Sequence, residues 1–228
     1  MRCTVETMNT IQLKPINTLE HLIEEAHYVV CNKIANGEIE VSNEASLQMQ
    51  LGAILNTLGS LYRFSPLEQF VVNLEVPHNL LKPTLKSSKA ARCDIEVMIK
   101  SIPNGDALAM AFIELKYFRK DDRSDETVTD NRFSVYKDIQ NLEGYIDLYP
   151  ADATKLLCYE IVITNNVNYT SPASTSQIRL GDGEHTGLTM AAEKNNSRYP
   201  VNSLNLRKNY AFHWTKYAPD LFSLLLKL

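Results

Sequence analysis

The sequence predicts an α/β fold in which a central β-sheet and helices form layers. Residues 93–118 contain two runs of alternating apolar and polar residues around a Pro-Asn-Gly-Asp turn, a pattern typical of a β-hairpin. Residues 156–164 are almost continuously apolar, as expected for a strand that is buried on both faces. The helix predicted between these two segments has the length of a connection between parallel strands.

Two helices are predicted before the hairpin, because apolar residues recur at three- and four-residue spacing over residues 17–37 and 43–60. Glu44 lies three residues before Leu47 and therefore continues the apolar stripe of the second helix. A carboxyl group there would need a partner at the edge of the core. Alternatively, a Glu in the first turn favours the helix dipole. Both interpretations stay open.

A strand is predicted over residues 70–77, with Glu75 near its end. Residues 79–92 form a loop that contains Lys82, Lys86, Lys89 and Arg92. Solvated cations are the ordinary explanation of such a loop, and phosphate binding is the alternative.

The charged segment 119–131 is predicted to be a loop, and a helix is predicted over residues 132–148. Residues 165–200 have a loop-like composition, with a strand at 187–192. Residues 201–217 alternate enough for one or two strands and mix Arg207 and Lys208 with aromatic residues. Such mixing suits stacking on nucleic acid, but a sheet-edge strand with one solvated face has the same pattern and is favoured.

Residues 219–228 are predicted to form a short apolar helix. The length of the chain suits a single domain over residues 1–228.

Composition limits the function. The hydrophobic content of 44% is ordinary for a globular protein. The net charge is −4, so the chain has no overall basic field to recruit nucleic acid, and any such contact would come from local patches. No signal-peptide pattern and no run of membrane-spanning length are present, which predicts a cytoplasmic protein that does not enter a membrane. The sequence contains no CxxC or HxxxH spacing, so nothing in it indicates a zinc site.

The hairpin carries a chemically distinctive group of side chains. Glu114 and Lys116 are two residues apart on one strand and point the same way, and antiparallel pairing sets Asp94 opposite them. Two adjacent carboxylates repel each other unless a cation lies between them or one takes up a proton. Oxygen ligands suit Mg²⁺ or Mn²⁺, and a lysine beside such an ion fits the hydrolysis of a phosphate ester. For so short a pattern, a solvated ion pair on a sheet face is the common alternative.

In its order of elements the chain resembles the PD-(D/E)XK, or restriction-endonuclease-like, nuclease superfamily. The core of that family is a helix, three strands, a helix and a further strand, with Asp on the second strand and (D/E)xK on the third. Residues about 42–164 follow this order, with Cys93 in place of the Pro that often precedes the Asp. The resemblance implies a three-layer core with a central mixed sheet flanked by helices. The N-terminal helical and C-terminal β-rich additions match nothing assigned and would decide the substrate.

The resemblance also implies roles for individual residues. Asp94, Glu114 and the carbonyl group of Leu115 would bind Mg²⁺ or Mn²⁺, and Lys116 would position or deprotonate water. Glu44 matches an acidic residue that assists metal binding, with Glu75 as its competitor. The polar residue of the later helix would be Gln140 or Tyr136.

The expected function is therefore a metal-dependent DNA endonuclease of restriction, phage defence or repair. Many such nucleases cut both strands as homodimers, and a homodimer is compatible with the resemblance. The residues expected to contact the DNA backbone are Lys86, Lys89, Arg92, Arg207 and Lys208. Two alternatives stay open: an inactive module of the same fold that binds nucleic acid or a protein partner, and an unrelated α/β protein in which the charges form a surface ion network.

Overall fold

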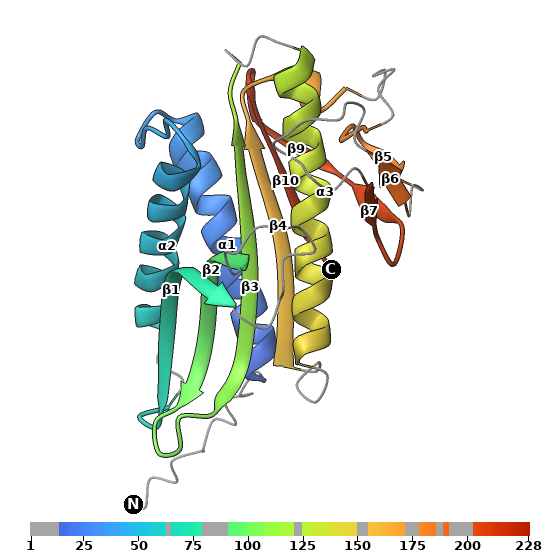
Figure 1. Cartoon of the computed structure of the whole chain (residues 1–228). Coiled ribbons are helices and arrows are strands. Elements are labelled where there is room, and N and C mark those ends of the chain that lie inside the picture. The colour runs from blue at the N-terminus through green and yellow to red at the C-terminus, as the bar shows by residue number, and fades with distance from the viewer. Residues whose placement is uncertain are drawn as a thin grey trace, which may run out of the picture.

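The computed structural model describes residues 14–62, 65–78, 91–120, 125–149, 155–171, 178–185, 189–191 and 203–228. The described chain has a mixed α/β fold built on a six-stranded sheet (Figure 1). The strands of this sheet, in spatial order, are β1 (Glu68–His78), β2 (Ala91–Ser101), β3 (Ala107–Phe118), β4 (Leu156–Thr164), β10 (Leu221–Lys227) and β9 (Trp214–Ala218). Neighbouring strands are antiparallel except β3 and β4, which are parallel. The predicted α/β class, hairpin and parallel pair are confirmed.

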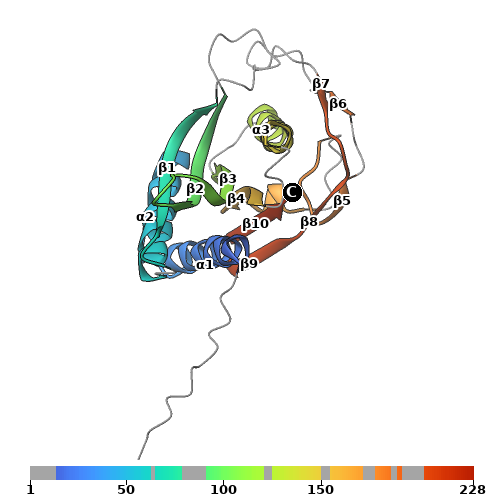
Figure 2. The same cartoon turned by 90° about the horizontal axis from the view of Figure 1, so that it is seen from below.

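Helices cover both faces of this sheet (Figures 1 and 2). The two N-terminal helices, α1 (Pro15–Ala35) and α2 (Glu44–Leu61), pack on one face, while α3 (Asp125–Leu148) packs on β3 and β4 from the other. Local sequence sets where α2 begins: Asn43 Oδ1 accepts from the Ser46 amide at 2.8 Å, and Ser46 Oγ accepts from the Asn43 amide at 3.0 Å. This reciprocal pair satisfies two amide groups that a helix start otherwise leaves unbonded.

The C-terminal part of the chain adds short strands beyond α3. β5 (Gly183–His185) pairs with β8 (Tyr210–Phe212), and β6 (Thr189–Ala191) pairs with β7 (Ser203–Asn205). A one-turn 3-10 helix, η2 (Val167–Tyr169), follows β4. Seen from below, α3 lies between the six-stranded sheet and these small sheets (Figure 2).

The core on the α3 side of the sheet is divided in two. One apolar cluster includes Phe112, Leu142 and Cys158, and a second includes Phe118, Ile139 and Val162. Charged residues come between the members of these two clusters on both central strands: Glu114 and Lys116 on β3, and Glu160 on β4. The opposite face, under α1 and α2, is one continuous apolar cluster. The charges are therefore confined to one side of the sheet.

Two expectations from the sequence are wrong. The last residues form strand β10, not a helix, and β10 is hydrogen-bonded to β4 on one side and to β9 on the other. A short apolar run has no periodicity that separates an inner strand from a buried helix. The charged segment 119–131 is partly helical, because α3 already begins at Asp125. Where one or two strands are expected within residues 201–217, the structure has β7, β8 and the start of β9, and β9 lies at the edge of the six-stranded sheet.

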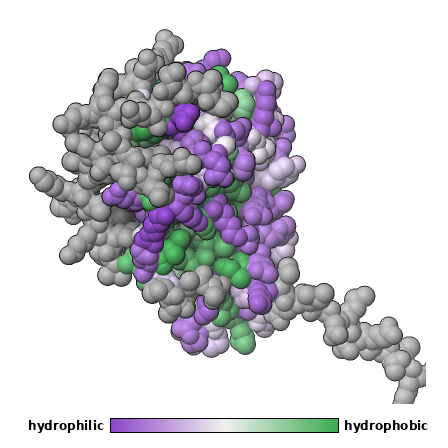
Figure 3. Space-filling model, turned by 90° about the vertical axis from the view of Figure 1, so that its right-hand side faces the viewer, coloured by the Kyte–Doolittle hydropathy of each residue, from purple (hydrophilic) through white to green (hydrophobic). Residues whose placement is uncertain are grey.

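The surface on the side of the small sheets is shown in Figure 3. Hydrophilic side chains border an apolar area in the lower half of this face. None of the described helices is long and apolar enough to cross a membrane.

Candidate functional site

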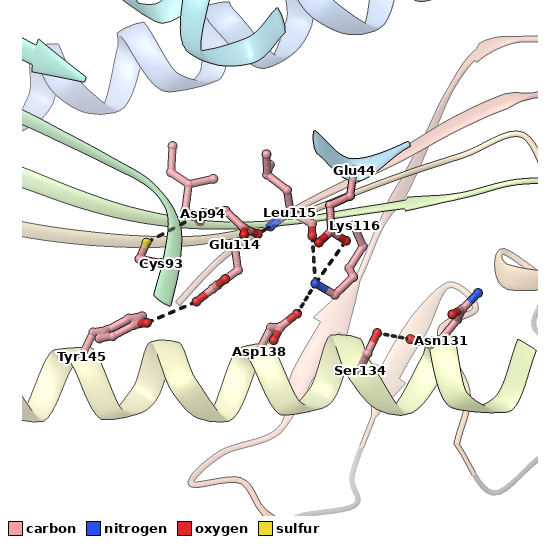
Figure 4. A network of polar contacts seen from close by, with 11 residues as sticks. Glu44, Cys93, Asp94, Glu114, Leu115, Lys116, Asn131, Ser134, Asp138 and Tyr145 are labelled. Atoms are coloured by element: carbon pink, nitrogen blue, oxygen red, sulfur yellow. Dashed lines mark hydrogen bonds and ion pairs between the residues drawn. The ribbon is translucent and has the colours of Figure 1, made fainter. Parts of the chain in front are cut away.

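The site begins where β2 and β3 separate. Their ladder ends at the pair Ile95–Ile113, although both strands continue and β2 stays paired with β1. At the next position the Asp94 side chain replaces the missing strand partner, since its Oδ2 accepts a hydrogen bond from the Leu115 amide at 2.7 Å. Asp94 and Glu114 thus lie beside each other at the fork between the strands (Figure 4).

A second pair of carboxyl groups comes from β3 and β4. Glu114 and Glu160 are direct partners in the parallel ladder, so both side chains project to the same face, toward α3. Glu114 is 3% exposed and Glu160 is fully buried. The Tyr145 hydroxyl on α3 is 3.4 Å from Glu114 Oε1. Neither carboxyl oxygen of Glu160 has a hydrogen-bond partner among the described residues.

Lys116 lies among these acids and uses its three N–H groups within the site (Figure 4). Its Nζ is 2.6 Å from Asp138 Oδ2 on α3, 3.3 Å from Glu44 Oε2 at the start of α2, and 2.9 Å from the Leu115 carbonyl oxygen. Lys116 and Asp138 are mostly buried, whereas the Glu44 side chain is 45% exposed. The ammonium group therefore lies between α2, which carries Glu44, and α3, which carries Asp138, and contacts both helices.

We call six residues the acidic cluster: Glu44, Asp94, Glu114, Lys116, Asp138 and Glu160. Their environment disfavours negative charge. Burial, opposed in part by Lys116 and by the Leu115 amide, raises the pKa of Asp94 to about 6. Burial and the neighbouring carboxylates raise the pKa values of Glu114 and Glu160 well above the usual range. Burial also raises the pKa of Glu44.

Lys116 responds in the opposite way. Burial by itself lowers the pKa of a lysine, but the carboxylates of Asp138, Glu44, Glu160 and Asp94 outweigh burial and hold the pKa of Lys116 well above its usual value. Lys116 is therefore a protonated hydrogen-bond donor at neutral pH.

The two candidates for the auxiliary acid have different surroundings. Glu44 reaches Lys116, whereas Glu75 Oε1 accepts from Gln48 Nε2 at 3.2 Å and its Oε2 is 3.7 Å from Arg92. Gln48 also donates to the Asp94 carbonyl oxygen at 2.6 Å and so anchors the backbone at the fork. Glu44 is thus both the first residue of its helix and a member of the acidic cluster.

Gln140, the residue expected to complete the site from the later helix, lies elsewhere. Its Oε1 accepts from the Asn205 amide at 2.8 Å, on the side of α3 that faces the small sheets. Its alternative, Tyr136, donates to the Arg179 carbonyl oxygen on that same side. The helix position that faces the sheet is Asp138, and the structure does not bring Gln140 into contact with the cluster.

The expected nucleic-acid contacts are only partly described. Lys86 and Lys89, with Lys82, lie outside the described residues. Arg92 is exposed on β2 near Glu75, and Lys208 lies 5.4 Å above the ring of Tyr210. Arg207 forms a two-pronged ion pair with Asp147 at the end of α3.

Two members of the acidic cluster were missed, and both left a signal in the sequence. Glu160 is the only charged residue in the apolar run of residues 156–164. Asp138 lies three residues after Val135 and four before Leu142, so helical spacing puts it on the buried stripe. An acid on a buried stripe needs a partner, and here the partners are other members of the cluster.

The donor set is chemically suited to Mg²⁺ or Mn²⁺. The cluster offers carboxyl oxygens and the Leu115 carbonyl, which are the ligands that these ions prefer. The unpartnered oxygens of buried Glu160 are a further fit. In the described part of the chain, no three Asp, Glu, His or Cys side chains are already arranged around one ion position. Comparison of the chain with protein-family models, with curated proteins and with solved structures gave no match.

Proposed function

We propose that this chain is a Mg²⁺- or Mn²⁺-dependent nuclease with a restriction-endonuclease-like core that hydrolyses phosphodiester bonds of DNA. The observation that carries the proposal is the acidic cluster: five carboxyl groups gathered around one lysine at the fork between β2 and β3. Ionised carboxyl groups this close together repel one another and destabilise the fold unless a cation or a proton removes part of their charge.

Asp94 and Glu114 are the residues that would hold the ion, together with the Leu115 carbonyl group. Asp94 Oδ2 is fixed by the Leu115 amide, and the Asp94 backbone is fixed by Gln48, so this carboxyl group is oriented before any ligand arrives. When bound, the ion supplies an activated water and neutralises charge that develops on the phosphate.

Lys116 supports the same reaction as a donor. In hydrolysis a water oxygen bonds to phosphorus, one P–O ester bond breaks, and the leaving oxygen takes up a proton. A lysine that stays protonated can hold the water or a phosphate oxygen in line but cannot remove the proton. In the metal-free chain the neighbouring carboxylates raise the pKa of Lys116, so the lysine is present as a positioning donor before an ion binds.

The test is cleavage of supercoiled plasmid, linear duplex, single-stranded DNA and RNA in Mg²⁺, Mn²⁺ or EDTA. We expect metal-dependent cutting of DNA by the wild-type chain. Asp94→Asn and Glu114→Gln are each expected to lower the rate by at least about 100-fold, since each removes a charge that the reaction requires. Light scattering of the protein on duplex DNA would report whether two copies bind together.

The matched control is Glu143→Gln, which removes a buried carboxyl of α3 outside the acidic cluster. Glu143 accepts from the Arg207 amide and the Tyr210 hydroxyl, and a glutamine oxygen can accept both. Its rate should stay within about threefold of wild type. Cutting that persists in EDTA or in all cluster variants would refute the site. Binding of DNA without any cutting would instead identify an inactive binding module.

A further inference from the structure

We propose that Glu160, together with Glu114 and Asp138, binds a second divalent cation beside the one assigned to Asp94 and Glu114. This inference rests on the proposed function and concerns residues of β4 and α3 that the sequence pattern of the hairpin does not include. Glu114 would then lie between the two ions.

The first argument is the isolation of Glu160. Its side chain is fully buried between Cys158 and Val162, which belong to the two apolar clusters on this face. No described residue donates a hydrogen bond to either of its oxygens. An ionised carboxyl in such a place is strongly unfavourable unless a cation accompanies it.

The second argument is that three acids from three elements meet here. Glu160 is the ladder partner of Glu114, and Asp138 approaches the same face from α3. Asp138 is 2.6 Å from Lys116, which lies two residues from Glu114 on the same face of β3, so the three carboxyl groups project into one region between the sheet and α3. Lys116 makes no hydrogen bond to Glu160: it donates to the Leu115 carbonyl oxygen and forms ion pairs with Asp138 and Glu44. To join a common ion, Asp138 would have to release Lys116.

The third argument is charge. If the five carboxyl groups of the acidic cluster are ionised and Lys116 is protonated, the cluster carries four net negative charges. One divalent cation would leave two of them in a buried site, whereas two cations would balance the set before an anionic phosphate binds. A proton on Glu160 is the competing way to remove its charge, and the two explanations predict different metal stoichiometries.

The test counts bound Mn²⁺ by calorimetry and by electron paramagnetic resonance on the full chain without DNA. Wild type is expected to bind two ions per chain, and Glu160→Gln, which keeps the side-chain volume, is expected to bind one. Asp94→Asn should also bind one, the double variant none, and the control Glu143→Gln two. Mn²⁺ should raise the melting temperature of Glu160→Gln less than that of wild type, because ions that bind the folded chain stabilise it. Circular dichroism in EDTA verifies that each variant is folded.

The outcomes separate this inference from the proposed function. A wild-type chain that binds one ion, or a Glu160→Gln variant that still binds two, overturns the second site while metal-dependent cleavage can stand. A wild-type chain that neither binds Mn²⁺ nor cuts DNA overturns both.

Discussion

Replacing Lys116 by methionine should strongly destabilise the metal-free protein. The substitution keeps most of the side-chain volume and removes the ammonium group. The side chains of Lys116 and its partner Asp138 are 14% and 11% exposed and lie 2.6 Å apart, so the variant leaves a buried carboxylate without its cation. Loss of one partner of a buried ion pair costs about 3–5 kcal/mol. We therefore expect a loss of about 3–5 kcal/mol.

The half-exposed contact of Lys116 with Glu44 adds little to this figure, because solvent screens it. Lys33→Met is the matched control: Lys33 is 2.7 Å from Glu38, but the two side chains are 40% and 50% exposed. Its expected loss is below about 1 kcal/mol. The assay is urea unfolding in EDTA, followed by circular dichroism. A loss below about 1 kcal/mol for Lys116→Met at pH 7 would refute the claim that the Lys116–Asp138 pair is a buried, mutually dependent pair.

The pH dependence gives a second check on the same variant. The pKa of Lys116 is raised in the folded chain, so its stabilising contribution is fully present below the pKa of an unfolded lysine, near 10. The contribution is lost only as the pH rises further, through the folded-state pKa. The gap between wild type and variant should hence be widest at about pH 9 and narrow as the pH falls through the raised pKa values of the cluster carboxyl groups, about 6 for Asp94, because a protonated carboxyl group no longer needs the charge of Lys116.

Three further predictions concern other parts of the molecule. The folded pKa of Asp94, about 6, lies above that of an unfolded aspartate, so wild type should lose up to about 3 kcal/mol of stability as the pH rises from 4 to 6, and Asp94→Asn should not show this loss. Unfolding profiles in EDTA that run parallel for variant and wild type would contradict this. Gln140→Ala should lower stability by about 1 kcal/mol, because it loses the hydrogen bond from the Asn205 amide, and should leave any cleavage rate within about threefold of wild type. A rate about 100-fold lower in a folded variant would instead assign Gln140 to the site. Gly59→Ala should destabilise the packing of α2 on β1 by about 1–3 kcal/mol in thermal unfolding, because an added Cβ would lie 2.0 Å from Phe70. The control Gly52→Ala should cost less stability, because its Cβ would meet only the flexible end of Leu74, at 3.1 Å.

The sequence predicted the fold well where a pattern extends over many residues. The alternation around residues 93–118 located both strands of the hairpin, and the spacing of apolar residues located α1 and α2 to within a few residues. The parity argument was also sufficient to bring Asp94 beside Glu114, because the register of a hairpin follows from its turn. These predictions depend on contacts that are close in sequence.

Predictions that depend on distant contacts were less successful. Whether residues 219–228 form a helix or a strand is decided by β4 and β9, which hydrogen-bond to β10 on its two sides. Which turn of α3 faces the sheet is decided by packing: the helix presents Asp138 to Lys116 and turns Gln140 toward Asn205. The sequence alone contains the amphipathic pattern but not the angle at which the helix meets the sheet.

Glu160 departs from the usual pattern of a strand that is buried on both faces. A strand buried on both faces is ordinarily built from apolar residues, and a carboxyl group there costs free energy that a leucine would not. The neighbouring Glu114 adds repulsion, and Lys116 is already shared between Asp138 and Glu44. Substitutions that remove this charge without loss of volume should therefore stabilise the metal-free chain and weaken metal binding at the same time. A substitution at a metal site should raise stability and lower metal affinity. In a buried structural ion network the same substitution should lower stability instead.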